Sequence, residues 1–209
     1  TMKATTRSVS GAVLMLAIIP VIVGLLACMP VPVGDPERSR IDAELNGIWA
    51  LTKGGEVDGY YLFRPWDKRT WLVLGVEDDD DEVKPAAVYK AWLKKLGGET
   101  FITWEMAGGM RDDGSFLPEY WLVFRVEKDG DDGINLHMLD LDFEGFEDLP
   151  TPEGYDGNYV KDMRRKFERV IRKNADDEAM YGDALALRRL ADDDQGDALD
   201  RIETYFSFE

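Results

Sequence analysis

Six short segments of this 209-residue chain are rich in β-branched and aromatic residues and are bounded by glycine, aspartate or proline. This composition is typical of β-strands. The segments are Gly47 to Lys53, Val57 to Arg64, Thr70 to Val76, Thr100 to Met106, Tyr120 to Glu127 and Ile134 to Leu141. The acidic, glycine-containing stretch 128–133 predicts a hairpin turn between the last two. Strands joined by such short turns predict an antiparallel meander that closes into a barrel or curls strongly.

Two helices are expected among these strands. Pro85 to Leu96 begins with a favourable proline, has apolar residues at helical spacing (Val88, Trp92 and Leu96) and is followed by two glycines. Tyr159 to Lys173 places apolar residues on one stripe and lysine and arginine opposite it. A short helical stretch is predicted near 176–181, a closing strand over 184–190, and a weak helical pattern over 197–206. The chain is therefore expected to be mainly β, with two or three helices.

Two short motifs resemble those of lipocalin-like, calycin-type barrels. Leu45-Asn-Gly-Ile-Trp49 contains the Gly-x-Trp that opens the first strand in that superfamily, and Phe167-Glu-Arg-Val-Ile-Arg-Lys-Asn174 precedes the last strand. The resemblance is to small, uncharacterised lipocalin-like lipoproteins of Gram-negative bacteria. It implies that Trp49 closes the barrel floor under a basic residue of the last strand, either Arg188 or Arg189. The chain departs from the family pattern in having two helices instead of one and no disulfide.

The first 28 residues describe an export signal. Lys3 and Arg7 precede an apolar run over 12–27 that ends at Cys28, the only cysteine. Leu25-Leu26-Ala27-Cys28 resembles the lipobox of bacterial lipoproteins, which implies removal of residues 1–27 and acylation of the Cys28 thiol. The alternative is an uncleaved membrane helix, but a run of about 16 residues is shorter than the roughly 20 that a spanning helix needs.

The rest of the chain is divided at residue 40. Prolines and few apolar residues make 28–40 a lipid anchor and tether, and 41–209 is expected to form one lipocalin-like β domain. Met29, not an aspartate, follows Cys28. In the proteobacterial system that the lipobox resembles, this implies sorting to the outer membrane, with the domain facing the periplasm.

The charge of the chain limits its partners. Its net charge is −17, and removal of Lys3 and Arg7 with the signal would make it −19. A surface this acidic repels nucleic acid and anionic phospholipid, so we expect no nucleic-acid partner. It could attract basic proteins or divalent cations, although solubility is the simpler explanation of its acidity.

Few residues suit catalysis. His137 is the only histidine and lies in a predicted strand, while the serines of the mature chain are Ser39, Ser115 and Ser207. A zinc site built from histidine and cysteine is excluded by their number. Glu105 is an acid in a predicted strand, beside Trp104, and could serve an acid-based hydrolase; Asp140 and Asp142 also have a setting that suggests burial. The protein is nevertheless expected to be no enzyme and to need no cofactor.

Acidic loops are candidates for calcium binding. Segments 129–133 and 192–197 have acids at alternate positions, and 78–82 is a run of five acids. The sixth position counted from Asp192 is Asp197, where an EF-hand loop requires glycine. Solvated acidic surfaces are the simpler interpretation, so no metal site is predicted.

Aromatic residues give the remaining positive signal. Trp66 is flanked by Arg64 in a predicted turn, where it could anchor a protein contact or a lipid headgroup. Trp49 and Trp104 lie in predicted strands and could fill the core or line a ligand site. We therefore expect an accessory or adaptor subunit of an envelope protein assembly. The alternative is a carrier that holds an apolar small molecule or lipid inside the barrel.

Overall fold

The computed structural model describes residue 29 and residues 31–77, 87–110, 116–147, 149 and 157–206. The predicted signal peptide, Cys28 and the acidic run 78–82 therefore lie outside the described residues. Within those ranges, no helix has both the length and the apolar character needed to cross a bilayer.

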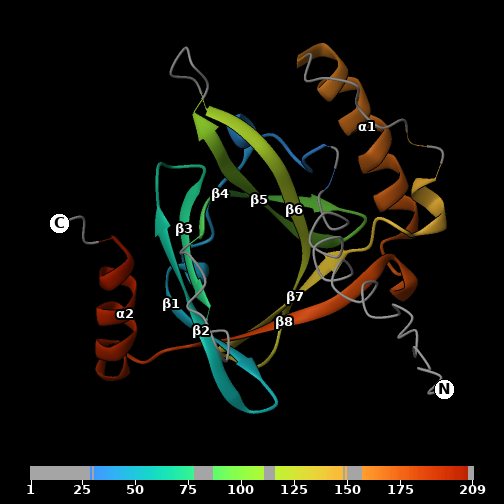
Figure 1. Ribbon diagram of the computed structural model, residues 1–209. Helices are drawn as coiled ribbons and strands as arrows, with labels where there is room; N and C mark the ends of the chain where they lie inside the picture. The colour runs from blue at the N-terminus through green and yellow to red at the C-terminus, as the bar shows by residue number, and fades with distance from the viewer. Residues whose placement is uncertain are drawn as a thin grey trace, which may run out of the picture.

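Eight antiparallel strands form a closed barrel, each pairing with the next in chain order (Figure 1). They are β1 (Gly47–Lys53), β2 (Glu56–Pro65), β3 (Trp71–Glu77), β4 (Ala87–Leu96), β5 (Glu99–Met110), β6 (Phe116–Lys128), β7 (Gly133–Leu139) and β8 (Tyr181–Arg189). Strand β8 closes the barrel against β1, with Trp49 opposite Arg189 and Thr52 opposite Ala186. The predicted lipocalin-like antiparallel barrel and its closing strand are confirmed.

The helix predicted over 85–96 is wrong, because Ala87–Leu96 is strand β4. The pattern misled because Val88, Trp92 and Leu96, four residues apart, also share one face of a strand. That outer face is covered, since Trp92 and Leu96 are buried, while Tyr89 and Ala91 are buried on the inner face. With apolar residues buried on both faces, β4 lacks the alternation that marks a half-exposed strand.

The interior of the barrel is packed with large side chains around Trp104. The ring of Trp104 lies 4.9 Å from that of Phe124 and 5.2 Å from those of Tyr61 and Tyr89, between ring centroids. Gly75 makes room for Tyr61, because a Cβ at Gly75 would lie 2.6 Å from the Tyr61 ring. Side chains occupy the middle of the barrel, as expected for eight strands.

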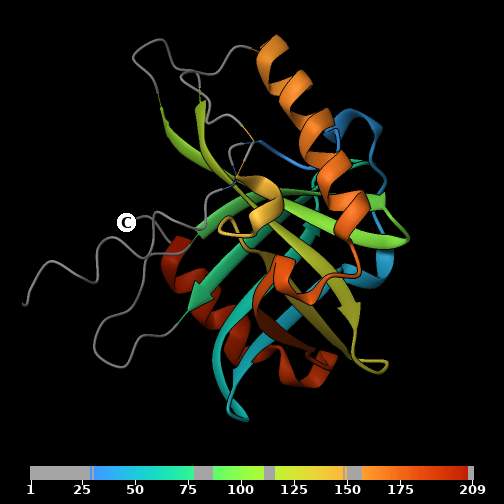
Figure 2. The same cartoon turned by 90° about the vertical axis from the view of Figure 1, so that its right-hand side faces the viewer.

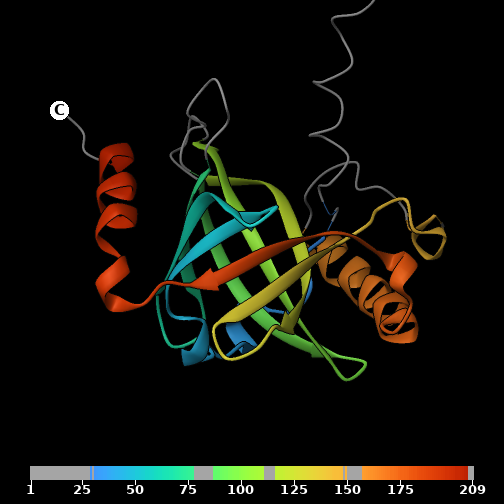
Figure 3. The ribbon, with the colours of Figure 1, turned by 90° about the horizontal axis from the view of Figure 1, so that it is seen from below.

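Two helices lie on opposite sides of the barrel (Figures 1 and 3). Helix α1 (Gly157–Asn174) buries Met163, Phe167 and Ile171 in a second core with outward-facing residues of the strands, among them Trp92 and Trp121. Figure 2 shows α1 lying across the outside of the barrel. Helix α2 (Gly196–Phe206) lies beside β3 and buries Ala198 and Ile202. The predicted helix 159–173 and the helical tail are therefore confirmed.

Short 3-10 helices complete the described chain. They are η2 (Pro36–Arg38), η3 (Ala43–Leu45), η4 (Glu144–Phe146), η5 (Glu178–Met180) and η6 (Asp192–Asp194). The helical stretch predicted near 176–181 corresponds to the single turn of η5.

The N-terminal segment, Met29 with residues 31–40, is packed on the barrel and is not the predicted tether. Met29 bridges to Trp121 in β6, and Val31 and Val33 are fully buried. The carbonyl oxygen of Val33 accepts hydrogen bonds from Trp92 Nε1 and Thr103 Oγ1, both 2.8 Å long. Met29, Val31 and Val33 recur at every second position, which is the period of an extended chain. The prolines between them give the stretch the composition of a linker. The folded domain therefore begins before residue 41.

Candidate functional site

Trp66 is the most exposed large apolar side chain in the part of the chain that the structure describes. Its side chain is 67% exposed, on the turn between β2 and β3. We call residues 64–70 the Trp66 turn. The prediction that Trp66 lies in a turn is confirmed, and the exposure means that it does not fold back onto the barrel rim. A large indole left in water is a candidate contact for a partner.

The Trp66 turn is held by its own hydrogen bonds. Asp67 Oδ1 accepts from the backbone N–H of Arg69 at 2.7 Å and of Thr70 at 2.8 Å. The backbone N–H of Trp66 donates to the Thr70 carbonyl oxygen at 2.9 Å. These backbone hydrogen bonds, that of Arg69 first, lower the pKa of the Asp67 carboxyl. The ionised carboxylate therefore fixes the backbone that presents Trp66, which reduces the entropy lost on binding.

Basic residues lie in the Trp66 turn and next to it in the sheet. Arg64 pairs in register with Leu72, and Leu72 with Lys90, so the sheet sets Arg64 and Lys90 in one outward-facing row. Arg64, Lys68 and Lys90 are exposed and make no ion pair within the described ranges. Arg69 is bound to Glu37 at 2.9 Å. The sequence missed Lys90, because the mistaken helix over 85–96 removed it from the sheet.

A shallow pocket of about 290 Å³ lies beside the turn, lined by Pro36, Glu37, Asp67, Lys68, Arg69, Thr70 and Lys90. Both of its acids are already engaged, Asp67 by the turn and Glu37 by Arg69. The surface thus combines one rigid aromatic anchor with an excess of positive charge, four basic side chains (Arg64, Lys68, Arg69 and Lys90) against Asp67 and Glu37, on a protein whose net charge is −17. This combination can bind an acidic protein surface that offers an apolar recess.

Trp49 is buried at the barrel floor and lies outside the Trp66 turn. Its Nε1 donates to the Leu45 carbonyl oxygen at 3.0 Å, and the Arg189 guanidinium lies 4.5 Å from the centroid of its ring. Arg189 Nη1 also donates to the Asn46 carbonyl oxygen at 2.8 Å. Arg188 instead pairs with Asp129. Of the two arginines left open by the sequence, Arg189 therefore covers Trp49.

A pocket of about 520 Å³ opens at this floor, between η3, the start of β5 and the β6–β7 turn. Its apolar wall includes Leu45, Trp49, Leu93, Val126 and Ile134. Charged residues stand around it, among them Lys128, which pairs with Glu44. The volume lies within the range of small-molecule sites. Trp104 does not line this pocket, because it is 1% exposed in the middle of the barrel.

The residues weighed for catalysis have structural partners. Glu105 accepts a hydrogen bond from Trp121 Nε1 at 3.0 Å. His137 lies in β7, as predicted for a strand residue; its Nε2 lies 2.9 Å from the Glu127 carboxylate but has no hydrogen-bond partner within the described residues. The backbone N–H of Asp142 donates to the Asp140 carboxylate. In the described residues, no three histidine, cysteine, aspartate or glutamate side chains are grouped to hold a metal ion.

Arg125 organises a polar cluster on the outer face of the barrel. It binds Glu178 through two hydrogen bonds of 3.0 and 3.2 Å, and its guanidinium lies 4.0 Å from the centroid of the Tyr181 ring. The hydrogen bond from Arg125, followed by its charge, lowers the pKa of Glu178. Burial raises the pKa of Tyr181 to about 12. The cluster joins η5 to β6 and β8.

We expect the substitution Glu178→Gln to lower the free energy of unfolding at pH 7 and to have little effect in acid. The folded state lowers the pKa of Glu178, so its contribution is present above the unfolded value of about 4.3 and is lost as the pH falls through the lower folded value. Urea unfolding of both proteins over a pH series measures the difference. Glu56→Gln, at an exposed carboxyl, is the control. A difference that persists unchanged into strong acid would contradict the role given to the ionised pair.

Comparison with known proteins adds no relative, because no family model, curated protein or solved structure matches this chain. The barrel fold therefore rests on the structure alone. Membership of the lipocalin-like lipoproteins stays a prediction from the two motifs, as does the lipobox.

Proposed function

We propose that this protein is a non-enzymatic accessory subunit of an envelope protein assembly. Acylated Cys28 would hold it at the periplasmic face of the outer membrane, and the Trp66 turn would dock on a protein partner. The observation that carries the proposal is a single exposed tryptophan, 67% exposed, on a turn that Asp67 holds rigid. Rigid aromatic anchors of this kind supply a large share of the binding energy in protein interfaces.

The charge around Trp66 defines the partner. Arg64, Lys68 and Lys90 are exposed in or next to the Trp66 turn and make no ion pair within the described ranges, so the partner should present carboxylates around an apolar recess. Opposite charges at the rim of an interface mainly speed association and fix orientation, while the buried indole sets the lifetime of the complex. A weak dependence on the cations and a strong dependence on Trp66 are therefore expected.

Native mass spectrometry of the protein extracted gently from membranes tests the proposal. We expect one defined polypeptide at a fixed ratio, and Trp66→Ala should reduce its occupancy by more than about tenfold, since loss of a hot-spot residue costs at least about 2 kcal/mol. The control is Val57→Ala, which truncates another exposed apolar residue, 48% exposed, at the far end of β2. The same partner bound equally by wild type and Trp66→Ala would overturn the role of the turn.

The carrier is the second candidate, and the floor pocket favours it. Its volume of about 520 Å³ and its apolar wall of Leu45, Leu93 and Val126 could hold a small apolar molecule. The packed middle of the barrel around Trp104 argues against a longer ligand along the axis. In the same spectra, the protein could carry a small apolar molecule and no second polypeptide. That result would support the carrier and contradict the accessory subunit.

A further inference from the structure

Helix α1 has a net positive charge, whereas the rest of the protein has a net negative charge. It contains seven basic residues and two acidic ones, a net charge of +5. Because the whole chain has a net charge of −17, the remainder carries −22. The basic residues are Lys161, Arg164, Arg165, Lys166, Arg169, Arg172 and Lys173. Such segregation creates a local positive potential on a strongly acidic protein.

Most of this charge faces away from the barrel. Met163, Phe167 and Ile171 are at most 2% exposed against the barrel and form the inner face of α1. All of the basic residues except Arg164 are exposed, as the helical period requires for the opposite face and its flanks. The result is an amphipathic helix whose apolar face is already occupied by its own protein. Its free face, which we call the basic face of α1, is cationic.

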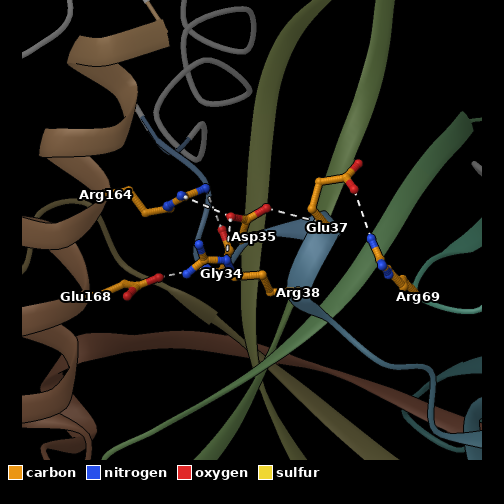
Figure 4. Close-up of polar contacts among 7 residues, drawn as sticks. All are labelled: Gly34, Asp35, Glu37, Arg38, Arg69, Arg164 and Glu168. Carbon is orange, nitrogen blue, oxygen red and sulfur yellow. Dashed lines mark hydrogen bonds and ion pairs between the residues drawn. The ribbon is translucent and has the colours of Figure 1, made fainter.

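The N-terminal segment engages one arginine and one acid of the helix (Figure 4). Arg164 donates to the Gly34 carbonyl oxygen at 3.0 Å and lies 3.6 Å from the Asp35 carboxylate. Glu168 accepts from the Gly34 backbone N–H at 2.9 Å. Asp162 pairs with Arg165 at 3.4 Å. Both acids of α1 are therefore engaged.

Five cations of the helix remain without an ion pair in the ranges that the structure covers. They are Lys161, Lys166, Arg169, Arg172 and Lys173. Between η2, β4 and α1 lies a groove of about 510 Å³, whose wall also carries Arg38 and Lys94. Five basic and two acidic side chains line this groove. An anionic group placed at its edge would meet several donors at once.

The predicted lipid anchor lies six residues before a contact with this helix, that of Gly34 with Arg164 and Glu168. Met29, the residue after Cys28, is 2% exposed and belongs to the same core as Met163 and Phe167. Its backbone N–H donates to the Trp121 carbonyl oxygen at 2.8 Å. Because a chain spans at most about 3.6 Å per residue, the six residues from Cys28 to Gly34 would keep the acyl chains within about 22 Å of the Gly34 contact. With the N-terminal segment packed on the barrel, little slack separates anchor from helix.

We propose that the basic face of α1 binds the headgroups of anionic phospholipids in the leaflet that the Cys28 acyl chains enter. The proposal takes the anchor from the proposed function but concerns a different surface from the Trp66 turn. Charge complementarity and the adjacent anchor commit it to lipid as the occupant. Basic residues near an anionic membrane each add to binding, and the effect fades within a Debye length.

The test uses the full lipidated protein reconstituted in vesicles of phosphatidylcholine alone or of equal parts phosphatidylcholine and phosphatidylglycerol. Amine-reactive labelling of Lys161, Lys166 and Lys173 is followed by mass spectrometry, with exposed Lys53 of the β1–β2 hairpin as the internal reference. We expect labelling of the α1 lysines to be at least about fivefold slower in the vesicles that contain phosphatidylglycerol. This factor corresponds to the interaction of one basic residue with an anionic surface. About 1 M salt, where the Debye length is about 3 Å, should abolish it.

Two variants assign the effect. Substituting glutamine for Arg165, Arg169 and Arg172 together should remove the dependence of Lys161 and Lys173 labelling on phosphatidylglycerol. Arg64→Gln with Lys68→Gln, at the Trp66 turn, should leave it unchanged. Equal labelling in the two kinds of vesicle would overturn the proposal. Failure of the wild-type protein to float with phosphatidylcholine vesicles would instead count against the lipid anchor, and binding of that protein to phosphatidylglycerol vesicles would then test α1 directly.

Discussion

Trp104→Ala is expected to lower the free energy of unfolding by about 3 to 5 kcal/mol, the usual cost of truncating a buried tryptophan. The side chain is 1% exposed, and four rings surround it, those of Tyr61, Phe63, Tyr89 and Phe124. Strands on both sides of the barrel supply these rings, so the surrounding structure cannot close over the void. Urea unfolding of the two proteins measures the loss.

The matched control is Trp66→Ala, which removes the same side chain from an exposed turn and should change stability by less than about 0.5 kcal/mol. A second variant, Trp104→Phe, keeps an aromatic ring in place. Within the described residues, Trp104 Nε1 has no hydrogen-bond partner, and losing a buried donor without a partner removes a desolvation cost of about 1 to 3 kcal/mol. Trp104→Phe should therefore cost much less than Trp104→Ala. A loss below about 1 kcal/mol for Trp104→Ala would mean that the interior is not packed around this ring.

The barrel could be predicted from the sequence because its strands and turns carry strong local signals. The turns after β1 and β6 contain Gly54, Gly55 and Gly130, which adopt positive φ. The Gly-Gly and Asp-Gly pairs in the sequence predict such turns. Gly-x-Trp placed Trp49 at the floor. The choice of Arg189 over Arg188 required the β1–β8 register, which pairs Trp49 with Arg189 and Ala50 with Arg188. No local pattern contains the register between the first and last strands.

The predictions of a helix over 85–96 and of a tether over 28–40 were wrong for the same reason. Each of these segments is buried through contacts with residues far away in the chain. Strand β4 has apolar residues buried on both faces, and in the N-terminal segment the residues between Met29, Val31 and Val33 are prolines, not polar residues. Trp92 of β4 donates to Val33 across 59 positions, and Glu168 of α1 accepts from Gly34 across 134. A proline-containing stretch reads as a linker when its covering partner is unknown. Only the packed helix and sheet reveal its buried face.

Of the two candidate surfaces, the Trp66 turn could be predicted from the sequence and the basic face of α1 was missed. Trp66 between Arg64 and Lys68 is visible in the sequence, because a turn composition and a large aromatic residue coincide there. The net charge of −17, by contrast, predicted repulsion from anionic lipid. That sum concealed the +5 of α1, since charges separated by more than a Debye length act independently at a surface. Where a charge lies therefore matters more for binding than the total does.

We expect the substitution Val33→Asp to lower the free energy of unfolding by about 3 to 5 kcal/mol, the cost of leaving a charge buried and unpaired. The Val33 side chain is fully buried in the second core. The Val33 carbonyl oxygen accepts hydrogen bonds from Trp92 and Thr103, which hold the segment on the barrel. A carboxylate at this position would lose its water without gaining a cation. Thermal or urea unfolding of the full chain measures the change.

Arg38→Ala is the control, because Arg38 lies in the same segment with a side chain that is 87% exposed; its effect should stay within about 0.5 kcal/mol. Val33→Ala, which only trims the contact, should fall between the two, at about 1 to 3 kcal/mol. A tether would make all three variants equal to wild type. If the graded losses are found, the segment between the predicted anchor and the barrel is part of the folded domain. Lipidation of Cys28 would then hold the barrel against the membrane on the side of α1, because no free chain remains to let it swing.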